Sequence, residues 1–388
     1  MGEVTGILDG KTLTVRLAGR IDTTNATETE KEINRCREEN SYESLVLDAE
    51  ELLYTSSVGL RMILRLKKAE PDFKIINASS EVYDTLEMTG FTEMIPVEKA
   101  YRKLSVDGCA VIGKGAKGTV YRYNPDTIVK VYMNPDSLPD IHRERELARK
   151  AFVLGIPTAI SYDVVKVGDS YGSVFELLDA ASFSQLIAED PENIEKYVFL
   201  YADLLNQIHK TLVKKEDMPD VKDLIFKWVK EITPYFTEAE MQVIDRLVRD
   251  VPDTLNMLHC DYHTNNLMFQ DGETLLIDMD TLAHGHPIFE LANIYVTYVG
   301  FGERNPSVVE GFIGLDYDTA KKIWKIFLPR YLKTEDKEKL EEVEKKARFL
   351  SYIRMMRHTI RRDKNEEEIA YCRDKILTLM KEINTLEF

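Results

Sequence analysis

Two short segments in the second half of the chain carry side chains suited to phosphoryl transfer. "LHCDYHTNNLMF" contains Asp261 and Asn266, and "LLIDMD" supplies Asp278 further along. Asp261 can accept the proton of an attacking hydroxyl, while Asn266 and Asp278 offer oxygen ligands to a Mg²⁺ ion that bridges nucleotide phosphates. The spacing therefore indicates phosphoryl transfer from a nucleotide.

Two histidines, His259 and His263, flank Asp261 and raise the alternative of a zinc site. Zinc prefers nitrogen and sulfur ligands, and no further histidine or cysteine follows His263 in this segment. The oxygen ligands around the histidines are typical of magnesium. We therefore interpret His259 as a structural residue that packs the loop.

A glycine-rich segment, "IGKGAKGTVYR", places Gly113, Gly115 and Gly118 in GxGxxG spacing. Glycines let a backbone run close to phosphates, but this pattern alone is a weak signal. "GTVYRYN" continues as a strand, whereas a dinucleotide-binding turn opens a helix. The next strand carries Lys130, whose ammonium can bind the α- and β-phosphates of a nucleotide. A glycine hairpin beside a surface lysine would give the same pattern.

These residues must be positioned by two kinds of structure. Closely spaced strands with turn residues surround the glycines and Lys130, and from about Asp190 the chain is mostly helical, with one loop-and-strand section around residues 255–285. The first part of the chain differs, because strands such as "SLVLDAE" and "FKIINA" alternate with helical segments. That order predicts an α/β sheet with parallel pairs.

From residue 105 to the C-terminus the chain resembles the aminoglycoside phosphotransferase and choline kinase family, which has a bilobal protein-kinase-like fold. "HCDYHTNN" is close to the family's HGDLHPGN, and "GHPIFELA" is close to its GDPxxDLA. The resemblance implies ATP and Mg²⁺ as cofactors, Asp261 as the catalytic aspartate, and Asn266 and Asp278 as metal ligands. It also implies an α+β domain with a β-rich N-lobe, residues 105–179, and a helical C-lobe, residues 180–388.

The same resemblance implies that Lys130 pairs with a glutamate on the first helix of this domain. "HRERELARKAFVLGIP" offers Glu144 and Glu146, and we choose Glu146 from its distance to the "GIP" turn. "SVFELLD" resembles the hinge between the lobes, with backbone groups from Glu176 to Leu178 facing adenine.

Two residues depart from the family pattern. Cys260 stands where glycine is usual, and Glu290 stands where aspartate is usual. The residues around Cys260 do not form the base signature of a nucleophilic thiol, so we do not expect it to act as a nucleophile. We expect Glu290 to support the catalytic loop as a hydrogen-bond acceptor. Neither departure removes a group that transfer requires, so we expect an active enzyme.

Residues 1–98 resemble a STAS domain, the fold of anti-sigma factor antagonists, through "LAGRIDTTNA" and "LVLDAEELLYTSSVGLRMIL". In that family a separate kinase phosphorylates the serine two residues before the glycine, and Ser57 matches that position. Hydroxyls ahead of "VGLRMIL" can also cap the helix that follows. We expect Thr55 and Ser56 to be turn and cap residues, and Ser57 to be a possible phosphoacceptor. Residues 99–104 are then the linker to the second domain.

The composition narrows the possible partners. The net charge of -16 over 388 residues argues against a general binder of nucleic acid or of anionic membranes. The four cysteines form no CxxC pair, and the sequence shows neither a secretory leader nor an apolar segment of membrane-spanning length. We therefore expect a cytoplasmic protein.

The motifs together favour an ATP- and Mg²⁺-dependent phosphotransferase that acts on a hydroxyl of a small molecule. The STAS domain would then be a regulatory or docking module for a protein partner. Two alternatives stay open. One is a protein kinase whose target is a STAS serine, either Ser57 in cis or trans or its equivalent in a partner. The other is a nucleotide-sensing module without turnover.

The acceptor is not identified by the sequence. Aromatic residues at helical spacing in the C-lobe are more often core than pocket. Near the C-terminus, "YIRMMRHTIRRDK" forms a basic stripe. The stripe either meets an anionic partner or balances the acidic remainder of the chain.

Overall fold

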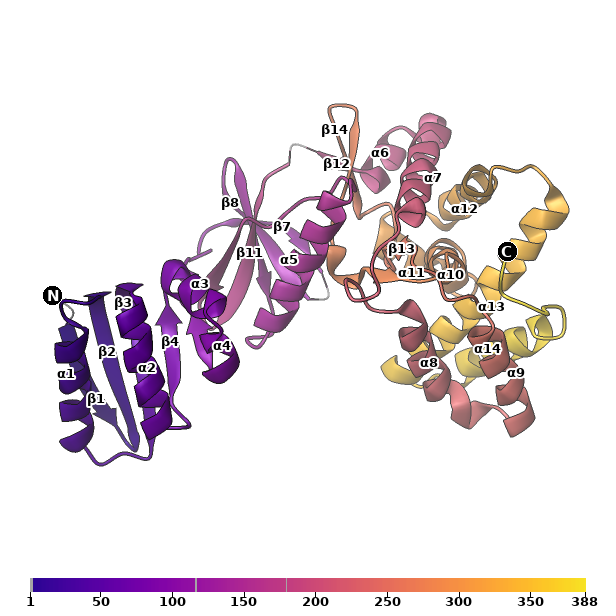
Figure 1. Cartoon of the computed structure of the whole chain (residues 1–388). Coiled ribbons are helices and arrows are strands. Elements are labelled where there is room, and N and C mark those ends of the chain that lie inside the picture. The colour runs from indigo at the N-terminus through magenta and orange to yellow at the C-terminus, as the bar shows by residue number, and fades with distance from the viewer. Residues whose placement is uncertain (1–2, 116, 179) are drawn as a thin grey trace. The chain divides into compact units, whose positions relative to one another are not determined.

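The computed structural model describes residues 3–115, 117–178 and 180–388. The chain divides into two compact units. The first contains the residues up to Ser105 together with Val164–Gly168, and the second contains Val106–Asp163 and Asp169–Phe388. Figure 1 draws the helices and strands of both units.

The first unit is built on a five-stranded sheet with the order β1-β2-β3-β4-β5. β1 and β2 are antiparallel, and the other neighbouring strands are parallel, which confirms the predicted α/β sheet with parallel pairs. On β2, Leu13, Val15 and Leu17 are buried. Because successive side chains of a strand point to opposite faces, this alternation gives the sheet one core-facing side.

The strands of this unit are β1 (Glu3–Asp9), β2 (Thr12–Ile21), β3 (Ser44–Thr55), β4 (Lys74–Ala78), β5 (Val97–Lys99) and β6 (Arg102–Lys103). Its helices are α1 (Ala26–Glu38), α2 (Ser57–Ala69), α3 (Ser80–Met88) and α4 (Phe91–Met94). α1 and α2 lie side by side against the sheet in Figure 1. Beyond the sheet, β6 pairs in parallel with residues 165–166 of β10 (Asp163–Val167).

The second unit begins with a β-rich lobe. Its strands are antiparallel in the order β11-β9-β8-β7, and helix α5 (Leu138–Val153) follows β9. The strands are β7 (Ala110–Lys114), β8 (Gly118–Asn124), β9 (Thr127–Tyr132) and β11 (Ser170–Glu176). This lobe places the glycine segment on β7 and β8, and Lys130 on the central strand β9.

The rest of the second unit is mainly helical and shares one large hydrophobic core. Its helices are α6 (Phe183–Glu189), α7 (Ile194–Lys210), α8 (Val221–Ile232), α9 (Glu238–Arg249), α10 (Ile288–Tyr298), α11 (Pro306–Ile313), α12 (Tyr317–Leu332), α13 (Lys337–Arg362) and α14 (Glu366–Leu379). The predicted loop-and-strand section contains β13 (Met257–Leu258), β14 (Leu267–Gln270), β15 (Glu273–Leu276) and β16 (Ala283–His284), and β14 also pairs with β12 (Ala181–Ser182). Among the described residues, no helix is both long enough and apolar enough to span a membrane.

Candidate active site

A buried carboxylate holds the loop between β13 and β14 in place. Glu290, on α10, is fully buried and accepts hydrogen bonds from the backbone amides of His259 at 2.5 Å and Cys260 at 2.7 Å. His209 lies 3.5 Å from the same carboxylate and contacts the Tyr331 hydroxyl at 2.7 Å through its other ring nitrogen. The longer glutamate therefore performs the supporting role expected at this position.

Cys260 has a left-handed backbone conformation, with φ of 66°. Glycine adopts this conformation without a steric penalty, which accounts for the family's preference for glycine at this position. Burial raises the pKa of the Cys260 thiol well above its usual value. The thiol is therefore protonated at neutral pH, in keeping with a structural role.

Asp261 follows in the same loop and is partly exposed, with 32% of its side chain accessible. Burial alone would raise the pKa of this carboxyl, but contact with His263 and the positive potential of His259 and Arg354 lower it to about 2. The His263 Nε2 atom lies 3.6 Å from a carboxylate oxygen of Asp261. A negatively charged Asp261 is thus available throughout the neutral pH range.

Asn266 stabilises the loop that follows Asp261. Its side-chain amide donates to the Asp261 carbonyl at 2.9 Å, and its backbone carbonyl accepts from the Ile277 amide at 2.9 Å. The second bond ties the loop to the residue before Asp278. Within the described ranges, the carboxamide oxygen of Asn266 accepts no hydrogen bond, so it can accept a ligand.

Lys130 is held between two carboxylates. Its Nζ atom lies 3.0 Å from Glu144 and 3.0 Å from Asp278. Burial alone would lower the pKa of Lys130, but the charges of Glu144 and then Asp278 raise it above its ordinary value. Glu144 also accepts a hydrogen bond from the Tyr132 hydroxyl at 2.7 Å.

The prediction that Glu146 pairs with Lys130 is wrong. Two residues correspond to about 200° of rotation around an α-helix, so Glu144 and Glu146 point to nearly opposite sides of α5. Glu144 is buried, whereas Glu146 has 58% of its side chain exposed and pairs with Lys150 at 2.8 Å. The burial of Ile141, Leu147 and Ala148 on the same face as Glu144 is a periodic signal that was available in the sequence.

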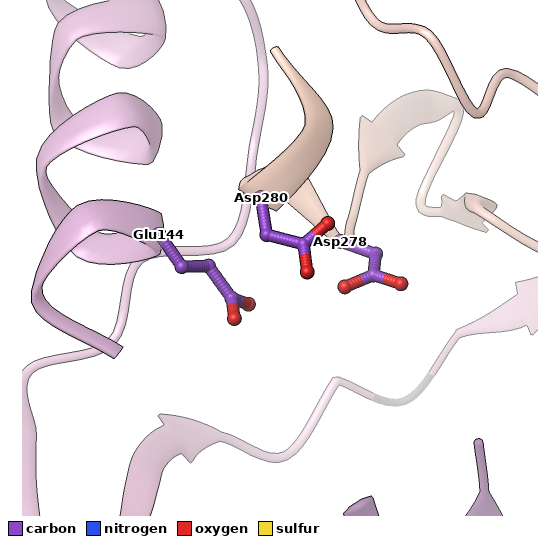
Figure 2. A group of neighbouring side chains, drawn as sticks. All are labelled: Glu144, Asp278 and Asp280. Carbon is purple, nitrogen blue, oxygen red and sulfur yellow. The ribbon is translucent and has the colours of Figure 1, made fainter. Parts of the chain in front are cut away.

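A third carboxylate, Asp280, joins this site and was missed in the sequence. Oxygen atoms of Glu144, Asp278 and Asp280 lie within 4.8 Å of one another. Figure 2 shows the three side chains directed toward a shared space, Glu144 from α5 and both aspartates from the turn after β15. Asp278 has a left-handed backbone with φ of 61°, a strained conformation that often marks functional sites. The repeated aspartate in "LLIDMD" was the signal for Asp280.

The glycine segment lies on β7 and β8, close to these carboxylates. Lys117, from the turn between the two strands, forms an ion pair with Asp280. The three glycines differ in what surrounds them. A Cβ atom at Gly118 would lie 2.4 Å from the Val131 carbonyl oxygen, whereas at Gly113 it would meet only the Val120 side chain, at 3.6 Å. A Cβ atom at Gly115 would have its nearest contact with the Gly118 carbonyl oxygen, at 3.9 Å.

We therefore expect Gly118→Ala to destabilise the second unit by about 1–3 kcal/mol, because the added methyl group clashes with the neighbouring strand's backbone. Gly113→Ala is the matched control and should change the free energy of unfolding by less than about 1 kcal/mol. Urea denaturation of the three proteins, followed by circular dichroism, measures both values. Equal losses of stability would show that the close contact at Gly118 is not decisive.

The predicted hinge lies at the end of β11. Glu176 is exposed and forms the last residue of the strand, and the Leu177 amide donates to the Asp126 carbonyl at 2.9 Å. Leu178 is half-buried. Their contact with adenine remains a prediction.

The three hydroxyls before α2 have different surroundings. Thr55 is buried, and its oxygen would lie 2.3 Å from a Cβ atom at position 59, so Gly59 is required there. Ser56 is the N-cap, and its side chain accepts from the Gly59 amide at 3.4 Å. Ser57 begins the helix and is exposed. Of the three, Ser57 has the hydroxyl most accessible to another protein.

Comparison with known proteins identifies both parts of the chain. A family model described as the phosphotransferase enzyme family matches residues 108–321, and one described as the STAS domain matches residues 5–104. The chain therefore combines a STAS-type sheet domain with a kinase-like phosphotransferase fold. No curated protein sequence matches the chain.

Several solved structures are similar to the chain. One is the gentamicin complex of APH(2")-IIa, with 16% identity and a TM-score of 0.44, covering 76% of this chain and 95% of that one. Another is a choline/ethanolamine kinase family protein from Mesorhizobium loti, with 12% identity and a TM-score of 0.42, covering 71% and 88%. An anti-sigma factor antagonist from Mycobacterium paratuberculosis has 20% identity and a TM-score of 0.24, covering 25% and 86%.

Proposed function

Because the chain belongs to the phosphotransferase enzyme family, we propose that it transfers the γ-phosphate of ATP to a hydroxyl of a small molecule. The observation that carries this proposal is the position of Lys130, 3.0 Å from both Glu144 and Asp278. A lysine fixed in this way presents a positive charge to nucleotide phosphates while the aspartate beside it remains available to their metal ion. The enzyme class follows from the family, and the identity of the acceptor is part of the proposal.

The nucleotide would lie between the two lobes of the second unit. Lys130 would bind the α- and β-phosphates, and the backbone at Gly113 and Gly115 would approach them, since glycine leaves the backbone uncovered by a side chain. Backbone groups from Glu176 to Leu178 would meet adenine. Lys117 forms an ion pair with Asp280, so it lies near the proposed metal site. When the nucleotide binds, Lys117 would leave Asp280 and bind a phosphate.

The carboxylate cluster fits a divalent cation. Magnesium prefers oxygen ligands, and Asp278 and Asp280 offer four carboxylate oxygens. Asn266 would add its carboxamide oxygen from the segment that is bonded to Ile277. We propose that these three residues hold Mg²⁺. When bound, Mg²⁺ would neutralise charge on the nucleotide phosphates. Glu144 would remain with Lys130, because both of its carboxylate oxygens contact the ammonium, at 3.0 and 3.2 Å, and one also accepts from the Tyr132 hydroxyl.

Asp261 would orient the acceptor hydroxyl and take its proton. A carboxylate with a pKa of about 2 is a weak base, so proton transfer would come late, after the acceptor oxygen has begun to bond to phosphorus. The acceptor O–H bond then breaks, the proton passes to Asp261, and the γ-phosphate leaves ADP for the acceptor oxygen. The close contact with His263 keeps the carboxylate oriented toward the open side of the loop.

For the STAS domain we propose a regulatory or docking role toward a protein partner. The exposed Ser57 at the start of α2 specifically favours a second candidate function, in which the kinase domain phosphorylates a STAS serine. The amides of the first helical turn and the positive end of the helix dipole would stabilise a phosphate there.

One experiment separates the two candidates. The protein is incubated with Mg·ATP alone and with a panel of hydroxylated metabolites, and each sample is analysed for ADP and for the intact mass of the protein. We expect ADP formation to rise with at least one metabolite and the protein mass to stay unchanged. A gain of one phosphate, absent from Ser57→Ala but present in the control Ser56→Ala, would favour the protein kinase. ADP formation that no acceptor stimulates, without a mass change, would argue against both.

A further inference from the structure

Arg354 differs from the neighbouring arginines of the basic stripe on α13 in its contacts. Arg357 and Arg361 both contact Glu231 on α8, at 3.1 Å and 2.6 Å. Arg354, one turn earlier, is half-buried, and its guanidinium makes no ion pair or hydrogen bond with any residue that the structure describes. Glu231 is used by the other two arginines, so among the described residues no carboxylate pairs directly with Arg354.

Two hydrogen bonds connect the helix that carries Arg354 to the loop that contains Asp261. Ser351 on α13 donates to the Ala292 carbonyl at 2.7 Å, and Asn293 on α10 donates to the Cys260 carbonyl at 3.1 Å. These bonds connect α13 through α10 to the residue before Asp261. Among the acidic groups that act on Arg354, Asp261 has the strongest influence, and Arg354 in turn helps to lower the pKa of Asp261.

A second unsatisfied donor lies beside Arg354. The Trp228 ring on α8 is 5.7 Å from the guanidinium carbon of Arg354 and 5.5 Å from that of Arg357. Trp228 is 6% exposed, and its indole N–H has no hydrogen-bond partner within the described ranges. The other tryptophan of the chain, Trp324, donates to Glu344 at 2.9 Å. A buried indole N–H normally donates to an acceptor. The unpartnered N–H of Trp228 therefore points to a ligand that supplies the acceptor.

We infer that Arg354 and Trp228 bind the carboxylate or phosphate group of an anionic acceptor, through the Arg354 guanidinium and the Trp228 indole N–H. Both groups are hydrogen-bond donors only, so they recognise an acceptor-rich group and cannot satisfy each other. The planar guanidinium matches the geometry of carboxylate and phosphate oxygens. A cationic acceptor would be repelled by Arg354. The inference rests on the proposed function, because it assumes that Asp261 faces the acceptor hydroxyl.

A binding experiment with simple anions tests this site. The full-length protein is first saturated with Mg²⁺ and a non-hydrolysable ATP analogue, so that the nucleotide's own phosphate site is occupied. Inorganic phosphate and, separately, acetate are then titrated in at constant ionic strength, and binding is followed by calorimetry. We expect saturable binding of at least one anion, and the preferred anion identifies the group as a phosphate or a carboxylate. Arg354→Gln should weaken that binding at least tenfold, and Trp228→Phe should weaken it at least threefold.

Arg361→Gln is the matched control, because it removes a guanidinium from the same helix but from a residue paired with Glu231. It should leave anion binding unchanged. If Arg354→Gln does not fold, Arg354→Lys retains the charge, loses the planar fork and should bind less tightly than wild type. Absence of saturable binding, equal binding in Arg354→Gln, or loss in Arg361→Gln would overturn the inference. Failure of the nucleotide analogue to bind in the first step would instead overturn the proposed function.

Discussion

Replacing Asp261 by asparagine should lower kcat by a factor of about 10² to 10⁴, the usual contribution of a positioned acid or base. The substitution keeps the size of the side chain but removes the negative charge that orients and finally deprotonates the acceptor hydroxyl. Asp261 is outside the cluster of Glu144, Asp278 and Asp280, so the affinity for Mg·ATP should change little. Steady-state kinetics at saturating acceptor, together with the Kd of a non-hydrolysable ATP analogue, measures both effects.

Asp280→Asn is the matched comparison for this experiment, because it also removes one carboxylate charge from the second unit. Asp280 belongs to the cluster that fits a cation, so its loss should raise the Mg²⁺ concentration needed for half-maximal activity. Activity of Asp261→Asn within threefold of wild type would argue against a catalytic aspartate. If Asp261→Asn also preserved every cellular function of the protein, the nucleotide-sensing alternative would be favoured.

Residue types that the proposed chemistry requires could be recognised in the sequence, because that chemistry restricts their types and order. Asp261, Asn266 and Asp278 were proposed in this way, and the structure places Asn266 and Asp278 on two segments joined by the bond between the Ile277 amide and the Asn266 carbonyl. The alternation of strands and helices in the first unit was equally accessible, since period-two burial on β2 is visible as Leu13, Val15 and Leu17.

The number of residues between a glutamate and the "GIP" turn could not predict which face of α5 points toward Lys130. Glu144 and Glu146 have the same chemistry, and only the packing of Ile141, Leu147 and Ala148 decides which of them faces β9. The missing hydrogen-bond partner of the Trp228 indole N–H could not be predicted from the sequence either. The sequence predicts a buried aromatic residue there, but whether its N–H finds an acceptor depends on the side chains that α8 and α13 bring together.

Glu144→Gln and Glu146→Gln form a pair of variants that separates these two positions. Glu144→Gln should lower kcat/KM for ATP by about 10- to 100-fold, because hydrogen bonds to charged groups contribute about 1.5–3 kcal/mol. The neutral side chain would leave Asp278 as the charged carboxylate in contact with Lys130, so Lys130 would compete more strongly with the metal ion for Asp278. Glu146→Gln removes only a contact with Lys150 at the surface, where such pairs contribute about 0–1 kcal/mol, so kcat/KM should stay within about twofold.

The Mg²⁺ dependence of the Glu144 variant distinguishes loss of positioning from loss of fold. If Lys130 competes for Asp278, a higher Mg²⁺ concentration should recover part of the activity of Glu144→Gln, whereas general unfolding would not respond in this way. Circular dichroism of both variants provides the control for structure. A large loss in Glu146→Gln with a normal Glu144→Gln would contradict the pairing of Lys130 with Glu144, since only Glu144 lies on the face of α5 that meets β9.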